Sequence, residues 1–142
     1  MRITTRGRYA LRASLAMAEL GKEGKPVSVN MISEMEKISP VFLEQIFFKL
    51  RRAGIVNSVR GPGGGFCFAV PPENISIRQI LDASGEDLDI IECDRRSSCE
   101  RNPECLSHAV WAGLDEMVKN YFNNITISSL VGKDIFSPES TG

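Results

Sequence analysis

The chain has 142 residues, enough for one compact domain with an appendage, and 42% of them are hydrophobic and 25% charged. This composition excludes fibrous and intrinsically disordered proteins. No apolar run approaches the length of a membrane span and the N-terminus lacks the apolar block of a secretory signal, so we expect a cytoplasmic protein without a membrane partner.

The net charge of −1 conceals a division of charge along the chain. Residues 1–70 carry 11 Lys and Arg against 5 Asp and Glu, whereas residues 71–142 carry 6 against 13. A basic first half is typical of a nucleic-acid footprint. On charge alone, an unevenly charged solvated surface explains the division equally well.

Two helices are predicted at the start of the chain. Residues 6–20 place apolar side chains at helical spacing behind a threonine cap offered by Thr4-Thr5, and a glycine follows the last of them. A serine-capped second helix covers residues 28–36, and we expect Ile32 and Met35 to face inwards.

A third helix begins at Ser39-Pro40, a cap followed by proline at the first helical position, and ends before Gly54. Its predicted buried face consists of Leu43, Ile46, Phe47 and Leu50. Its predicted outer face consists of Val41, Glu44, Gln45, Phe48, Lys49, Arg51 and Arg52. Two short helices with a tight break, the second polar and basic outside, are typical of a helix-turn-helix.

The next segment predicts a β-hairpin. Strand-like residues 55–59 and 66–70 flank the glycine-rich sequence Arg60-Gly61-Pro62-Gly63-Gly64-Gly65, which is typical of a wing. A phosphate-binding loop is the alternative, but no Lys-Ser/Thr pair and no helix follow the glycines. Cys67 lies between two phenylalanines of the second strand, and we expect it to be a buried structural thiol.

Two more helices are predicted in the second half. Ser76 and Gln79 form a capping box for a short helix that ends near Ala83. A longer helix runs from Leu106 to about Asn124. Its apolar residues, which recur every three to four positions, are Leu106, Val110, Leu114, Met117, Val118, Tyr121 and Ile125. Such a seam suits a partner helix in a homodimer, with an intramolecular core as the alternative.

Between these helices, three cysteines and the only histidine fall within sixteen residues. Cys93, Cys99 and Cys105 are each separated by five residues, and His108 follows the last by three. The remaining loop residues are charged or small and cannot build a core, so a bound group must order them. Thiolates and an imidazole suit an iron–sulfur cluster first, zinc second and a redox disulfide switch third. If the last helix begins near Cys105, then Cys105 and His108 share one helical face.

The helix-turn-helix and wing supply candidate DNA-reading residues. Gln45 can pair with adenine, Glu44 can accept a hydrogen bond from cytosine, and Arg60 can enter a minor groove. As the alternative, Glu44 is simply a solvated helix residue. The basic residues expected to hold phosphates are Lys49, Arg51, Arg52, Arg2, Arg6, Arg8 and Arg12. Gly63 and Gly64 at the wing tip complete the candidate DNA-binding set.

Taken together, these motifs resemble the IscR family of bacterial winged helix-turn-helix iron–sulfur regulators. The matching stretches are Met1-Arg2-Ile3-Thr4, Gly7-Arg8-Tyr9-Ala10, Leu43-Glu44-Gln45, Leu50-Arg51, Val59 to Phe66, the Cys-x5-Cys-x5-Cys-x2-His motif, Asn123-Asn124-Ile125-Thr126 and Leu130-Val131. The resemblance covers the chain to about residue 131. One departure is Val41, where the family often has a small polar residue, so an operator sequence does not transfer from relatives.

The resemblance implies a homodimeric repressor or activator, not an enzyme, with one [2Fe–2S] cluster in each subunit. By the same resemblance the cluster ligands are Cys93, Cys99, Cys105 and His108, and the operator is double-stranded DNA of cluster-biogenesis or related genes. A cluster-assembly scaffold is the implied cluster donor. In related nitric-oxide sensors, a carboxylate near the N-terminus of the partner chain helps to hold a [4Fe–4S] cluster. This chain has Arg8 at that position. A [4Fe–4S] cluster and zinc are the alternatives.

We therefore expect a mostly α fold with a small β-hairpin wing, a winged helix-turn-helix with a long C-terminal dimerisation helix. The expected segments are a DNA-binding domain (1–72), a short helix with the cysteine loop (73–104), a dimerisation helix with a docking segment (105–130) and a flexible tail (131–142). Two other functional hypotheses are an electron carrier or redox enzyme and a constitutive zinc-stabilised DNA-binding protein.

Overall fold

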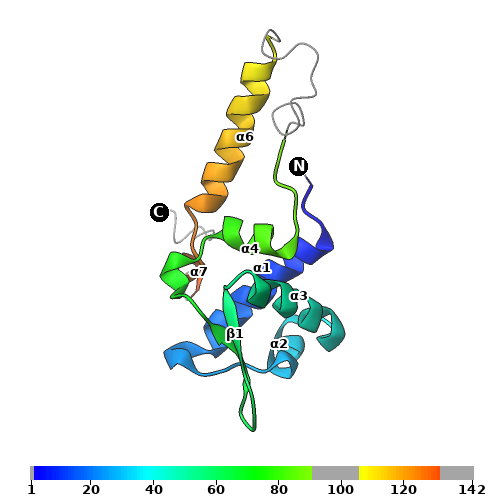
Figure 1. Cartoon of the computed structure of the whole chain (residues 1–142), viewed down its shortest axis with the longest axis vertical. Coiled ribbons are helices and arrows are strands. Elements are labelled where there is room, and N and C mark those ends of the chain that lie inside the picture. Colours follow the sequence, from blue (N-terminus) through cyan, green and yellow to red (C-terminus); the bar gives the residue numbers. More distant parts are fainter. Residues whose placement is uncertain (1, 91–105, 132–142) are drawn as a thin grey trace, which may run out of the picture.

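The computed structural model describes residues 2–90 and 106–131. In chain order its elements are α1 (Thr5–Leu20), η1 (Lys22–Gly24), α2 (Val29–Glu36), α3 (Pro40–Arg52), β1 (Val56–Val59), β2 (Gly65–Phe68), η2 (Pro72–Asn74), α4 (Ile77–Ser84), α6 (His108–Asn123) and α7 (Ile127–Leu130). Figure 1 shows α6 projecting from one end of the molecule and the β1–β2 hairpin from the opposite end. This is the mostly helical winged helix-turn-helix that the sequence predicts.

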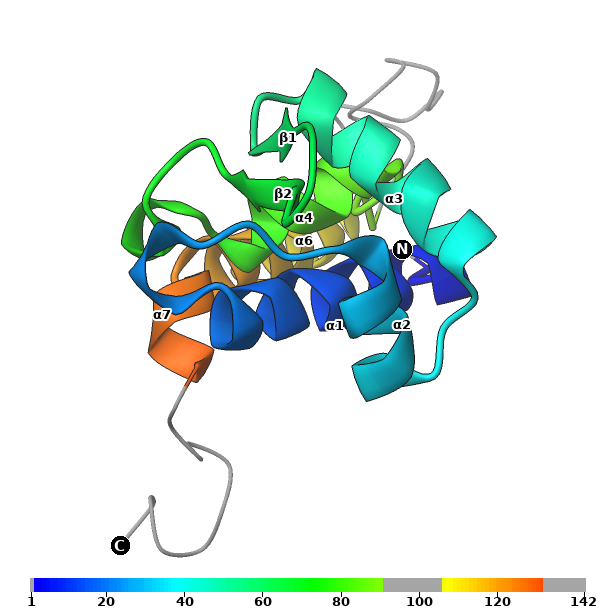
Figure 2. The same ribbon diagram turned by 90° about the horizontal axis from the view of Figure 1, so that it is seen from below.

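One apolar core unites the elements of both halves of the chain. Its fully buried side chains include Met17, Ile32, Leu43, Phe47, Leu50, Ile80 and Ile127. Backbone hydrogen bonds between Ile77 and Ile125 and between Ile127 and Ile75 fix the start of α7 beside α4. Viewed from the hairpin end in Figure 2, α2 and α3 lie on one side of the molecule and α7 on the other. The helix-turn-helix and the segment that precedes the cysteine loop therefore share one core.

Side-chain caps begin the short helices where the sequence predicts them. The Ser28 hydroxyl accepts from the amide of Met31, and the Ser39 hydroxyl accepts from the amide of Phe42, each at 3.2 Å. Ser76 forms the full capping box with Gln79. Each cap satisfies an amide that would otherwise be unpaired at a helix start, so these boundaries depend only on local sequence.

Three expectations about burial and helix boundaries are wrong. Met35 is 48% exposed, because Ile32 is the one residue that eight-residue α2 buries among the described elements. Cys67 is half-buried, because the preceding Phe66 takes the core-facing place by stacking on Phe47. The helix expected from Leu106 begins instead at His108, after a two-residue turn.

The last described residues dock on the core. Val131 donates its amide to the Ile127 carbonyl at 3.3 Å and packs against core residues, although it was assigned to the tail. The rest of that predicted tail lies outside the described residues. No helix within the described ranges is both long and apolar enough to cross a membrane.

Candidate nucleic-acid interface and metal site

The outer face of α3 is held in place by its inner face. Leu43, Ile46, Phe47 and Leu50 are all buried, as predicted. The opposite side therefore points to solvent, where Glu44 and Gln45 are both exposed. A hollow of about 400 Å³ on this side is lined by Val41, Glu44, Gln45, Phe48 and Lys49.

The hairpin places Arg60 at its exposed tip. β1 and β2 pair antiparallel from Val56↔Phe68 to Val59↔Gly65, and the Gly64 amide closes the tip by donating to the Gly61 carbonyl at 2.9 Å. A Cβ at Gly64 would lie 2.2 Å from the Val59 carbonyl oxygen, so only glycine fits this turn. Arg60 is exposed at the tip, as a residue that enters a DNA groove must be.

The basic residues at the C-terminal end of α3 have distinct partners. The Arg51 guanidinium donates to the Ser58 hydroxyl at 3.4 Å and so bridges α3 to β1. The Arg52 guanidinium lies 5.8 Å from the centre of the Phe48 ring. Phe48, on the predicted outer face, thus packs with Arg52. Both cations remain exposed and stand on the side of the molecule that carries Glu44 and Gln45.

The N-terminal arginines are less available than the sequence suggests. The Arg6 guanidinium donates to the Gly85 carbonyl at 3.2 Å and lies 4.0 Å from the Glu86 carboxylate. Arg12 pairs with Glu36 at 3.0 Å. These charges are partly neutralised within the chain, so they contribute less to phosphate binding than their number implies.

Glu86 is a buried carboxylate that the sequence analysis missed. Its side chain is 1% exposed. It accepts hydrogen bonds from the Thr4 amide at 2.9 Å, from the Thr4 hydroxyl and from the Gly7 amide at 3.1 Å. A Cβ at Gly7 would lie 2.5 Å from the Glu86 side chain, so glycine makes room for it. The carboxylate satisfies donors at the start of α1 and fastens residues 85–86 to that helix.

The environment of Glu86 determines its charge state. Burial by itself raises the pKa of this carboxyl group, but the hydrogen bonds from Thr4 and Gly7, together with the Arg6 charge, outweigh burial. The pKa of Glu86 consequently lies below its ordinary value of 4.5. The carboxylate is ionised at neutral pH, as its acceptor role requires.

A second contact fastens the same segment to α6. The Ile90 amide donates to the Asp115 carboxylate at 2.8 Å, while the Lys119 ammonium lies 2.6 Å from Asp89 and 2.9 Å from Asp115. The hydrogen bonds that the Lys119 ammonium donates to the Asp89 and Asp115 carboxylates raise the pKa of Lys119. Burial raises the pKa of Asp115, yet the Ile90 amide and Lys119 lower it overall. Residues 85–90 therefore connect the start of α1 to the middle of α6.

The candidate metal ligands are only partly within the described ranges. His108 is the first residue of α6 and is half-buried. Cys93, Cys99 and Cys105 lie outside the described residues. Among the residues that are described, no group of three or more His, Cys, Asp and Glu side chains is placed to hold a metal ion.

The predicted dimerisation seam lies on a helix that packs against the core only near its C-terminal end, through Phe122. None of the residues of α6 is buried. Its exposed apolar side chains are Leu106 just before the helix, then Val110, Trp111, Leu114, Met117 and Tyr121, whereas Val118 is half-buried. Trp111 was missing from the predicted seam. Figure 1 shows most of α6 projecting beyond the other described helices, with its C-terminal end near α4.

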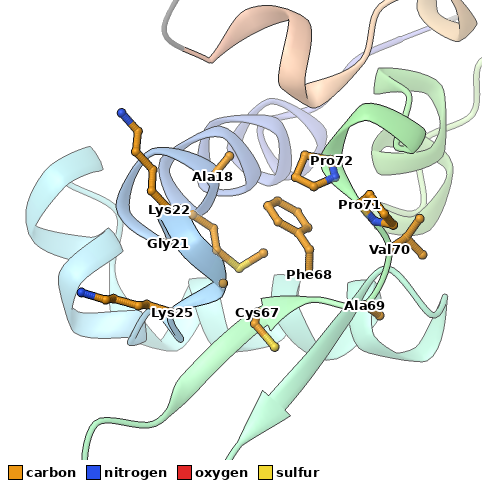
Figure 3. A pocket seen from close by; sticks show the side chains of 12 residues that line it. Ala18, Gly21, Lys22, Lys25, Cys67, Phe68, Ala69, Val70, Pro71 and Pro72 are labelled. Atoms are coloured by element: carbon orange, nitrogen blue, oxygen red, sulfur yellow. The ribbon is translucent and has the colours of Figure 1, made fainter.

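A separate hollow of about 500 Å³ lies between the end of α1 and β2. Figure 3 shows Phe68 and the Pro71-Pro72 pair on one side of it and Gly21 on the other, with Cys67 on β2 at its border. Lys22 and Lys25 extend their ammonium groups outwards. This hollow shares no lining residue with the hollow on the outer face of α3, and none of the candidate DNA or metal residues lines it.

Comparison with known proteins agrees with this geometry. The model of the Rrf2 family, described as an iron-dependent transcriptional regulator, matches residues 3–133. A putative HTH-type transcriptional regulator of Haemophilus influenzae is 44% identical over 133 residues, which are 94% of this chain and 88% of that protein. The HTH-type transcriptional regulator IscR of Klebsiella pneumoniae is 41% identical over 131 residues, 92% of this chain and 80% of the relative.

Among solved structures, CymR, the global cysteine regulator of B. subtilis, is similar over 92% of this chain and 95% of that chain, with a TM-score of 0.78 and 27% identity. The relatives are thus transcriptional regulators that share both sequence and architecture with this chain. The chain belongs to the Rrf2 family of DNA-binding transcriptional regulators.

Proposed function

We propose that this regulator senses iron–sulfur cluster status through a [2Fe–2S] cluster and controls cluster-biogenesis or related genes. The observation that carries the proposal is the donor set of Cys93, Cys99, Cys105 and His108, with its last member at the first turn of α6. Three thiolates and one imidazole form a complete ligand set for such a cluster. The bound cluster would supply a redox-sensitive and degradable link between these four residues.

The described borders of the cysteine loop are compatible with this ligand set. The Ile90 amide is hydrogen-bonded to Asp115, which follows His108 by seven residues in α6. At a rise of 1.5 Å per residue, His108 and Asp115 are about 10.5 Å apart along the helix. Cys93 follows Ile90 by three residues, and three extended residues span up to about 11 Å. The first thiolate and the imidazole can therefore reach a common centre.

For DNA binding, we propose that α3 enters the major groove with Glu44 and Gln45 towards the bases. The exposed Arg60 would enter the adjacent minor groove, and Lys49, Arg51 and Arg52 would hold phosphates. The relatives named as HTH-type regulators and the buried inner face of α3 support this orientation. Affinity should fall steeply as salt rises.

We further propose that the exposed side of α6 forms a homodimer. Apolar side chains on a projecting helix favour a second copy, which would place two recognition helices about 34 Å apart on a near-palindromic operator. Met117 is 70% exposed at the middle of this side. We expect Met117→Asp to give the mass of a single chain in light scattering, whereas wild type gives twice that mass.

Met35→Asp, on α2, is the matched control because Met35 is also exposed but lies outside α6. This variant should remain a dimer. A Met117→Asp protein that keeps the wild-type mass would contradict the proposed interface.

Residues 85–90 offer a physical route from cluster to DNA reader. Asp89 and Ile90 contact α6 at Lys119 and Asp115, and Glu86 contacts the start of α1. Arg6, which pairs with Glu86, also lines a hollow of about 210 Å³ with Gln45 and Lys49 of α3. Cluster binding just beyond residue 90 could thus favour one arrangement of the reader, and this differential stability would shift DNA affinity.

Cluster loading is tested by comparing two cysteine variants. Freshly purified wild type should show visible absorption under anaerobic conditions, with iron and sulfide in equal amounts. Cys99→Ala should abolish the absorption because one thiolate ligand is lost. Cys67→Ala is the matched control, since Cys67 is a half-buried thiol on β2 and does not belong to the proposed ligand set, and it should keep the wild-type spectrum.

The metal content decides among the alternatives. Four iron and four sulfide per chain would assign a [4Fe–4S] cluster instead. Colourless protein with one zinc per chain would assign the constitutive zinc-stabilised function. Absorption that survives in Cys99→Ala would overturn the proposed ligand set.

A further inference from the structure

The outer face of α3 carries two large apolar side chains that the core does not use. Val41 is 67% exposed and Phe48 is 55% exposed, although the inner side of the same helix is fully buried. They are seven residues apart, two helical turns, with Glu44 and Gln45 between them. All four line the same hollow of about 400 Å³.

The surroundings of this apolar pair identify the chemistry that would cover it. Lys49 lines the hollow, and the Arg52 guanidinium lies over the Phe48 ring. A complementary surface must therefore present anions at its margin and apolar groups towards its middle. The major groove of DNA has this arrangement, because phosphates border a floor on which every thymine exposes a C5 methyl group. A protein surface is the other candidate, but the cations beside Phe48 favour DNA.

We propose that Val41 and Phe48 determine operator specificity by contacting thymine methyl groups on either side of the base pairs that face Glu44 and Gln45. The inference rests on the proposed insertion of α3 into the major groove. Seven residues of helix rise about 10.5 Å, and base pairs are stacked about 3.4 Å apart. The two thymines should accordingly lie about three base pairs apart in each half-site.

Replacing thymine by uracil tests the proposal, because it removes one methyl group and leaves every hydrogen bond of the base pair unchanged. The probe is a duplex recovered by wild-type full-length protein from random-sequence DNA, with each thymine replaced in turn. We expect two positions per half-site at which uracil weakens binding about three- to fivefold, the value for one buried methyl group. Other positions should be insensitive.

Two variants assign the positions to side chains. Val41→Ser should abolish the uracil effect at one position and keep it at the other, and Phe48→Ser should do the reverse. Both residues are exposed, so neither substitution opens a cavity in the core. Met35→Ser, which removes an exposed apolar side chain from α2, should keep both uracil effects.

Two results would overturn the inference while leaving DNA binding by α3 intact. One is wild-type binding that is insensitive to uracil at every position. The other is uracil sensitivity that persists unchanged in both variants. In that case Val41 and Phe48 would instead be assigned to contact with a protein partner. Failure of the wild-type protein to select any sequence would instead contradict the proposed function itself.

Discussion

Phe47→Ala is expected to lower the free energy of unfolding by about 3–5 kcal/mol. Phe47 is fully buried on the inner face of α3, and its ring stacks on Phe66 of β2 with centroids 4.8 Å apart. Phe66 in turn exchanges two backbone hydrogen bonds of 2.8 Å with Val27, just before α2. Truncation would therefore leave a cavity where the recognition helix, the wing and the turn before α2 meet. Urea denaturation followed by circular dichroism measures the change.

Phe48→Ala is the matched control, because Phe48 follows directly on the same helix but is largely exposed. It should change the unfolding free energy by no more than about 0.5 kcal/mol. Equal losses in the two variants would contradict the orientation of α3 on which the DNA-binding surface depends. A loss of unfolding free energy in Phe48→Ala alone would contradict this orientation of α3 more strongly.

Glu86→Gln is expected to lower the free energy of unfolding at neutral pH by about 2–3 kcal/mol. The variant keeps the size of the side chain but replaces a charged acceptor of three hydrogen bonds by an amide. The amide also presents an N–H group to the donors of Thr4 or Gly7. The start of α1 and the segment before the cysteine loop should both loosen, since Glu86 joins them.

The pH dependence of this effect has a definite sign. Because the folded-state pKa of Glu86 lies below the ordinary value of 4.5, the unfolded chain takes up the proton first as pH falls. Glu86 therefore stabilises the fold fully when the pH is above 4.5. This stabilisation is lost as the pH falls from 4.5 towards the lower, folded-state pKa of Glu86. The difference between wild type and Glu86→Gln in urea denaturation should therefore shrink on acidification below pH 4.5.

Glu34→Gln on the surface of α2 provides the control for a general effect of removing one carboxylate. Glu34 is exposed, and its substitution should change stability by less than about 0.5 kcal/mol at either pH. A Glu86→Gln penalty that stays constant between neutral and acidic pH would contradict the role assigned to the ionised carboxylate.

The features that local sequence determines could be predicted. Ser39-Pro40 specifies the start of α3 by itself, and the three-to-four spacing from Leu43 to Leu50 specifies its inner face. The glycine-rich tip likewise predicted the hairpin. The physical causes are helix caps, side-chain periodicity and turn geometry, and each of these depends on only a few neighbouring residues.

The features that depend on distant partners could not be predicted. Glu86 contacts Thr4 across 82 residues of sequence, and no spacing rule relates the two. Arg6 and Arg12 were expected to hold phosphates, yet carboxylates elsewhere in the fold lie beside both. Met35 continues an apolar pattern, yet its side chain is exposed on α2. Such contacts arise from packing, which a single sequence does not encode in any local signal.

Operator ranking should be measured first, because the proposed role of the cluster is to change which DNA sequences the protein prefers. Dissociation constants for a panel of selected operator duplexes should be measured under anaerobic conditions with cluster-loaded wild type, Cys99→Ala and Cys67→Ala. We predict that Cys99→Ala changes the order of affinities among the operators, whereas Cys67→Ala keeps the wild-type order. The same order and the same affinities for cluster-loaded wild type and Cys99→Ala would contradict the coupling.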